Sequence, residues 1–101
     1  MKLRIVAPWK PILRNQQEFS LELSGEVGPG HPLFGKQVQA LARPFDNDDV
    51  LFAILETKQY AVVHLTWSGK QEPHSLFPGT FIFSTLNEWV TECMTKDHNN
   101  V

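Results

Sequence analysis

The chain of 101 residues is long enough for one domain with one hydrophobic core, and its apolar fraction of 42% excludes a wholly disordered protein. From residue 15 onward, five basic residues face eleven acidic ones, which gives this body a net charge of −6. Such a body repels a phosphate backbone, so nucleic acid is not an expected partner. No apolar run is long enough to cross a bilayer and no signal-peptide pattern opens the chain, so we expect a cytoplasmic protein without a membrane partner.

Cysteine and histidine usage argues against a metal site or a cofactor. The single cysteine, Cys93, excludes an internal disulfide and a cysteine-based zinc site within one chain. The histidines show no spacing typical of metal ligands, and neither a nucleotide-binding nor a nucleophile-elbow motif occurs. We therefore expect neither metal nor cofactor.

The first predicted element is a short edge strand at residues 2–6, where polar and apolar side chains alternate. Pro8 and Pro11 end this strand. Trp9, between the two prolines, is expected to fill part of the core from an irregular segment.

Residues 15–27 fit two patterns. As a strand, Phe19, Leu21 and Leu23 share one face; as a helix, Phe19, Leu23 and Val27 form one apolar stripe. In the helical interpretation Asn15 is the N-cap, and Gly28 and Pro29 stop the helix. These start and stop signals favour a helix near 16–26, although Gly25 weakens it.

The centre of the fold is predicted at Asp48 to Lys70, which contains two apolar runs rich in β-branched and aromatic residues. They predict strands at 49–56 and 60–67. A third strand is expected at 37–43, where Val38, Ala40 and Ala42 alternate with Gln37, Gln39 and Leu41. These three strands would form an antiparallel meander.

The clearest helix is predicted at 85–95, after a short strand candidate at 80–83. Thr85 and Glu88 form a capping box, and the apolar residues that follow, Cys93 included, lie on one stripe. The fold class is therefore α+β: a single domain over 1–101, with an antiparallel sheet of three to four strands packed by the C-terminal helix and by a helix near 16–26.

The acidic run at Asp46, Asp48 and Asp49 does not fit a calcium loop, because Leu51 and Thr57 occupy the positions that require glycine and glutamate. We interpret these short side chains as shaping the turn into the next strand.

His64 is the polar residue that most suggests chemistry, because it lies inside a predicted strand. Alternation places it on one face with Tyr60 and Thr66. If His31 or Asp49 folded over this polar cluster, a general acid and base pair would result. The alternative is a strand histidine that is hydrogen-bonded to a neighbour and has no chemical role.

The segments Asp48 to Phe52 and Val62 to Lys70, followed by Pro78 and Trp89, resemble a group of short uncharacterised bacterial proteins. The resemblance covers most of the chain from about Glu18 onward. It implies a compact bacterial single-domain protein and assigns no activity. In size, acidic body and sheet-plus-helix plan the chain is also similar to immunity proteins that neutralise bacterial toxins.

The absence of a catalytic constellation and the acidic body together predict a non-enzymatic protein that acts by stoichiometric binding, as an immunity-type inhibitor of a basic toxin does. The partner-binding candidates are the loop acids and two aromatic anchors: Asp46, Asp48, Asp49, Glu72, Glu56, Phe45 and Phe77. Two alternatives remain open: a small hydrolase-like enzyme using His64 in a groove, and a homo-oligomer that pairs through the edge strand at 2–6.

Overall fold

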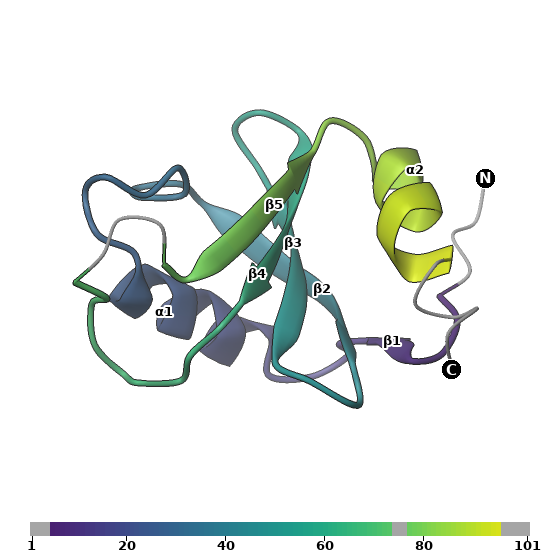
Figure 1. The fold of residues 1–101 in the computed structure, drawn as a ribbon, viewed down its shortest axis with the longest axis horizontal. Helices are drawn as coiled ribbons and strands as arrows, with labels where there is room; N and C mark the ends of the chain where they lie inside the picture. Colours follow the sequence, from purple (N-terminus) through teal and green to yellow (C-terminus); the bar gives the residue numbers. More distant parts are fainter. Residues whose placement is uncertain (1–4, 74–76, 96–101) are drawn as a thin grey trace.

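An antiparallel sheet of five strands runs through the molecule, with the strands side by side in sequence order (Figure 1). The computed structural model describes residues 5–73 and 77–95. The strands are β1 (Trp9–Pro11), β2 (Val38–Pro44), β3 (Asp49–Ile54), β4 (Gln59–His64) and β5 (Gly79–Phe83). The helical elements are α1 (Gln16–Glu26), α2 (Leu86–Trp89) and the π-helical turn η1 (Val90–Met94). The α+β class and the central meander are confirmed, but the predicted count of three to four strands was too low.

The additional strand is β1, in the segment that we expected to be irregular. The expected strand at 2–6 lies largely outside the described residues, and residues 5 and 6 are not in a strand. Instead Trp9 pairs with Pro44, and Pro11 pairs with Ala42. Prolines are tolerated here because β1 is an edge strand, so its outer side needs no ladder hydrogen bonds. Trp9 is only 2% exposed, which confirms its predicted place in the core.

The helical interpretation of residues 15–27 is confirmed by α1. Phe19, Leu23 and Val27 are buried on its inner side, as the helical stripe predicted. Asn15 is the N-cap residue of α1, as predicted, but its backbone is left-handed with φ of 60° and its side chain makes no capping hydrogen bond. Its carbonyl oxygen instead accepts a hydrogen bond from the Glu18 N–H at 3.1 Å.

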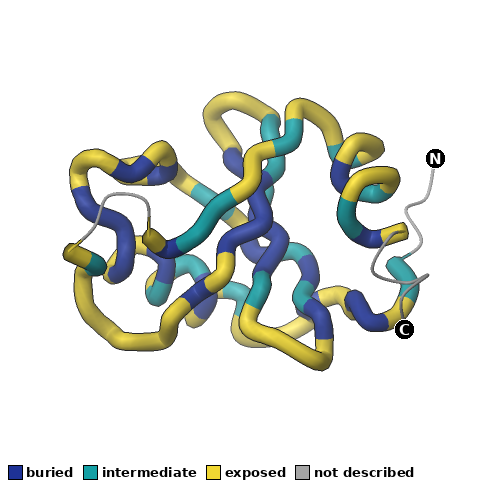
Figure 2. Tube along the Cα trace, in the orientation of Figure 1, coloured by how far each residue is buried: buried dark blue, intermediate teal, exposed yellow. Residues whose placement is uncertain are grey.

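The sheet is covered on both faces, with α1 on one side and α2 and η1 on the other (Figure 1). Strands that are buried on both faces have near-continuous apolar sequences, as β3 and the middle of β4 have. The layer under α1 contains Val50, Phe52, Ile54, Ala61 and Val63. The opposite layer contains Trp9, Ala42, Leu51, Val62, Trp89 and Met94. Figure 2 shows β3 and β4 as the buried centre of the trace.

A bulge in β2 places two alanines of this strand in different layers of the core. Its register against β3 shifts between Ala40 and Ala42. Without the bulge these alanines would share a face, as we expected from simple alternation. In the structure Ala40 lies in the layer under α1 and Ala42 in the opposite layer, so that prediction for Ala42 was wrong.

The C-terminal helix is held against the second face by two tryptophans. The rings of Trp9 and Trp89 meet edge to face, with centroids 5.2 Å apart and an interplanar angle of 89°. The predicted cap is present, since the Thr85 Oγ1 accepts a hydrogen bond from the Glu88 N–H at 3.1 Å. The sequence did not indicate that the helix continues as a π-helical turn from Val90.

Replacing Trp89 by alanine should lower the free energy of unfolding by roughly 3 to 5 kcal/mol, because it removes the largest buried side chain of this helix. Chemical denaturation measures this change. Leu13→Ala is the matched control, since Leu13 is exposed and its loss should cost about 0.5 kcal/mol or less. Equal losses in the two variants would contradict the packing of α2 on the sheet.

Candidate functional site

The β2–β3 turn carries the first group of predicted binding residues. Within it the Asn47 Oδ1 accepts a hydrogen bond from the Asp49 N–H at 2.7 Å, and the Asn47 amide donates to the Asp46 Oδ1 at 3.1 Å. The side chain that shapes the backbone of this turn is therefore that of Asn47, and not those of the three aspartates for which we predicted this role. Asp46 and Asp48 remain exposed, and Asp49 is half-buried where β3 begins.

A second acidic segment reaches the same end of the sheet. The Leu65 N–H donates to the Asp48 carbonyl oxygen at 3.3 Å, which joins the end of β4 to the β2–β3 turn. One residue further on, the Thr66 hydroxyl donates to the Glu72 Oε1 at 2.7 Å. Asp46, Asp48, Asp49 and Glu72 are therefore brought to one end of the sheet.

Two glutamates of α1 complete this end. The last turn of α1 lies against residues 66–69, where the Gly69 N–H donates to the Glu22 Oε2 at 3.1 Å. We call the group formed by Glu22, Glu26, Asp46, Asp48, Asp49 and Glu72 the acidic end. Among the described residues, no lysine or arginine lies within ion-pair distance of these carboxylates.

Glu26 is the buried member of the acidic end, with no exposed surface. The Trp67 N–H donates to its Oε2 at 2.8 Å, and the Thr66 N–H donates to its Oε1 at 2.9 Å. Desolvation, assisted by a hydrogen bond with the Glu22 carboxyl, raises the pKa of Glu26 from 4.5 to about 7, against the opposing effect of the two backbone donors. Below that pH Glu26 is protonated and donates to Glu22.

These contacts hold the 66–72 loop in an uncommon shape. Trp67 has a φ of 56°, in the left-handed region that favours glycine. Its N–H is held by Glu26, and its ring meets Phe19 edge to face with centroids 5.6 Å apart. The Glu72 N–H also donates to the Glu26 carbonyl oxygen at 2.9 Å. Glu26 thus joins the end of α1 to both ends of the loop.

Sequence reasoning missed Glu22 and Glu26. A signal was present, because Glu26 lies three residues after Leu23 on the stripe that also contains Phe19. An acidic residue on a buried stripe requires a hydrogen-bond donor nearby. The donors are backbone N–H groups about 40 positions away along the chain, which no local pattern reveals.

His64 pairs with Asp49, one of the two partners that the sequence allowed. The His64 Nδ1 lies 2.9 Å from the Asp49 Oδ1, and the two residues are direct neighbours across β3 and β4. The side chains are 61% and 31% exposed, respectively. A carboxylate that orients an imidazole can support general base chemistry, but no nucleophile of the described residues is hydrogen-bonded to this pair.

The rest of the predicted polar cluster is dispersed. Tyr60 packs against the second core layer, and Thr66 lies past the end of β4, hydrogen-bonded to Glu72. His31 is buried: its Nδ1 accepts from the Leu33 N–H at 3.0 Å, so its Nε2 carries the proton donated to the Pro78 carbonyl oxygen at 2.9 Å. His31 is therefore not the partner of His64, because its Nδ1 is bound to the Leu33 N–H and its Nε2 to the Pro78 carbonyl oxygen, directly before β5.

The remaining predicted binding residues lie at different places. Phe45 is exposed and directly precedes the β2–β3 turn, so it borders the acidic end. Phe77 is also exposed, two residues before β5 begins. Glu56 lies in the β3–β4 turn at the opposite end of the sheet, where it accepts a hydrogen bond from the Gln37 N–H at 2.8 Å. Glu56 is therefore not part of the acidic end.

A groove of about 370 Å³ opens beside Asp49 on the face covered by η1. It is lined by Asp49, Val62, Phe81, Phe83, Glu92 and Cys93. Cys93 was expected on an apolar stripe; it is half-buried and packs against the second core layer. The lining combines two carboxyl groups with two phenylalanine rings, which together suit a cationic group.

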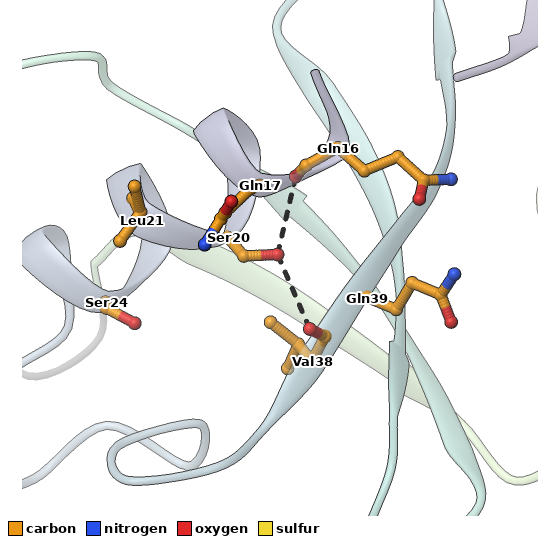
Figure 3. A pocket seen from close by; sticks show the side chains of 7 residues that line it. All are labelled: Gln16, Gln17, Ser20, Leu21, Ser24, Val38 and Gln39. Atoms are coloured by element: carbon orange, nitrogen blue, oxygen red, sulfur yellow. Dashed lines mark hydrogen bonds between the residues drawn. The ribbon is translucent and has the colours of Figure 1, made fainter. Parts of the chain in front are cut away.

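Another hollow, of about 350 Å³, lies between α1 and the start of β2 (Figure 3). Its walls carry the amide and hydroxyl side chains of Gln16, Gln17, Ser20, Ser24 and Gln39. The Ser20 hydroxyl lies 3.4 Å from the Val38 carbonyl oxygen and thereby ties α1 to β2. Among the described residues, none of the side chains that line this hollow is titratable.

No family model matches the chain, and no curated protein or solved structure matches it either. The resemblance to short bacterial proteins and to immunity proteins therefore stays a prediction. Over the described residues, no group of three or more histidine, cysteine, aspartate or glutamate side chains could hold a metal ion. The same part of the chain contains no helix with the length and apolar character needed to cross a membrane.

The raised pKa of Glu26 predicts a pH-dependent stability. The folded protein holds a proton that the unfolded chain releases, so the free energy of unfolding should fall as the pH rises from about 4.5 to about 7. Glu26→Gln stays neutral, and its amide oxygen can still accept from the loop. This variant should lack that pH dependence and be more stable than the parent at pH 8, by roughly 1 to 3 kcal/mol.

Denaturation at a series of pH values measures both effects. Glu18→Gln is the matched control, because Glu18 is an exposed acid on the same helix. It should keep the slope of the parent protein. A Glu26→Gln variant with the parent slope would mean that Glu26 is ionised throughout this range.

Proposed function

We propose that this protein binds a basic partner protein in a stoichiometric complex through its acidic end, and that it inhibits that partner as immunity proteins inhibit toxins. The single observation that carries the proposal is that α1, the β2–β3 turn and the 66–72 loop converge to place five at least partly exposed acidic side chains around the buried Glu26, with no described lysine or arginine paired to them. Carboxylates that repel one another in the free protein gain most when an external lysine or arginine neutralises them.

The geometry around these acids supports a protein partner over a small ligand. Phe45 and Trp67 are exposed large apolar side chains at or beside the acidic end. Aromatic side chains bordered by charges are typical anchors of protein interfaces. The acids are spread over turns and loops, and among the described residues no metal-binding cluster gathers them. A broad surface of this kind suits a folded basic partner.

The hydrolase-like alternative has one observation in its favour, the His64–Asp49 pair at 2.9 Å. Its weakness is that the histidine side chain is largely exposed, while catalytic acid–base pairs generally lie in sites that exclude water. Binding therefore explains more of the acidic end than catalysis does, because catalysis at His64 assigns no role to the exposed side chains of Asp46 and Asp48.

Asp46→Lys combined with Asp48→Lys should abolish capture of the partner, because both side chains are exposed and each substitution replaces attraction by repulsion. The tagged protein and this variant are used to capture proteins from a lysate of the native host at low and moderate salt. A basic protein should be retained in stoichiometric amount by the parent protein, and retention by the variant should fall at least about tenfold.

Glu56→Lys is the matched control, since it makes the same change of charge at the opposite end of the sheet. It should retain the partner as the parent protein does. Equal retention by the parent protein, the double variant and the control would contradict binding through the acidic end. Loss of the partner in the control alone would move the interface to the β3–β4 turn.

A further inference from the structure

We propose that the outer edge of β5 accepts an extended segment of the basic partner as a sixth strand, with an arginine side chain of that segment passing over Gly79 into the groove beside Asp49. This inference rests on the proposed function, because it takes a basic partner as given and identifies the part of it that binds here.

The first support is the open edge of β5. In the order of the sheet β5 is terminal, and within the described chain no strand pairs with its outer side. Its sequence, Gly-Thr-Phe-Ile-Phe, contains neither charge nor proline, the features that normally protect an edge strand from pairing. None of its residues is buried, as the trace in Figure 2 shows. An edge of this kind is suited to strand addition.

The second support is the row of residues that leads from this edge into the groove. Asp49 lies opposite His64 across β3 and β4, and His64 lies opposite Gly79 across β4 and β5. A residue of an added strand that lies opposite Gly79 would continue this row on the same face of the sheet. The groove therefore becomes accessible to a side chain that crosses Gly79.

Gly79 leaves the path open. No atom lies within 4 Å of the place where a Cβ would stand on this residue. Neighbouring strands are about 4.8 Å apart, and an arginine side chain spans roughly 7 Å at standard bond lengths. Its guanidinium would thus pass beyond β5, whereas a side chain at position 79 would block it.

Charge complementarity identifies the occupant. The charged side chains that line the groove are Asp49 and Glu92, both acidic, and Phe81 and Phe83 supply ring faces. The Asp49 Oδ1 is used by His64, and its Oδ2 accepts no hydrogen bond from the described residues. Asp49 lies three strand spacings, roughly 14 Å, from an added strand, and His64 stands between them in the row. A guanidinium that has passed Gly79 can therefore pack on a phenylalanine ring and is attracted by the two carboxylates across the groove, without a direct hydrogen bond to Asp49. Phe81, which is 73% exposed, would be covered by the added strand.

The test uses the full chain labelled with ¹⁵N and two synthetic peptides of equal charge. The first alternates valine and arginine over seven residues, with blocked ends; in the second, proline replaces valine, so that it cannot form a ladder. Only the first peptide should bind. On binding, the amide signals of Gly79 to Phe83, Asp49 and His64 should shift.

Gly79→Val and Asp49→Asn should each weaken binding of the first peptide by at least about tenfold, the former by blocking the path and the latter by removing the charge. Leu21→Ala is the control, because Leu21 is exposed on α1, away from β5, and this variant should bind as the parent protein does. Thermal unfolding of each variant shows whether it is folded.

Equal binding of the two peptides, no binding of the first, or an unchanged affinity in the folded Gly79→Val variant would each overturn the inference. Signal shifts confined to residues 46–48 would also overturn it. So would a concentration-dependent self-association of the protein that Phe81→Lys abolishes, because a second copy of the chain would then occupy the edge of β5. The captured partner separates this inference from the proposed function. If the Gly79→Val variant retains the partner and the Asp46→Lys/Asp48→Lys variant loses it, this inference is wrong and the proposed function stands.

Discussion

The burial of β3 and β4 on both faces is the constraint on which the rest of the structure depends. A sheet whose central strands are apolar on both sides needs a separate cover for each face. α1 supplies one cover, and the C-terminal helix, fastened by the contact between Trp9 and Trp89, supplies the other. Both faces of the central strands are therefore occupied by the core. The surfaces that we propose for recognition therefore lie at one end of the sheet and along the outer edge of β5.

The acidic end depends on a buried carboxyl group for its shape. The Glu26 carboxyl group accepts hydrogen bonds from two backbone N–H groups of the 66–72 loop. Its burial costs free energy when it is ionised, and that cost raises its pKa. The same residue thereby fixes the loop that carries Glu72 and makes the acidic end sensitive to pH. The protonation of one side chain, Glu26, is therefore linked to the conformation of the 66–72 loop.

Sequence patterns predicted what depends on local order. The apolar runs at 49–56 and 60–67, the capping box at Thr85 and the stripe on α1 each correspond to an observed element. The misplaced features depend on contacts between distant residues. The short strand at Trp9 exists because β2 pairs with it, and Ala42 changes face because of a bulge that alternation cannot reveal.

In the candidate site, too, local contacts were predictable from the sequence and contacts between distant residues were not. The Asp49–His64 pair was within reach of the sequence, because both residues lie at the paired ends of one predicted hairpin. Glu72 was expected as a loop acid, but its position beside Thr66 depends on Glu26, whose partners lie far away in the chain. His31 was one of two possible partners of His64, and its Nε2 is instead bound to the Pro78 carbonyl oxygen, directly before β5. Its role is set by the tertiary structure.

The central claim is that charge at the acidic end drives association with a basic protein. The association rate constant of the purified protein with its captured partner, measured as a function of ionic strength, tests this claim most directly. The account predicts that the rate constant falls roughly fivefold or more as the ionic strength rises from about 0.05 to about 0.5 M, while the dissociation rate constant changes little. An association rate constant that is independent of salt would contradict it.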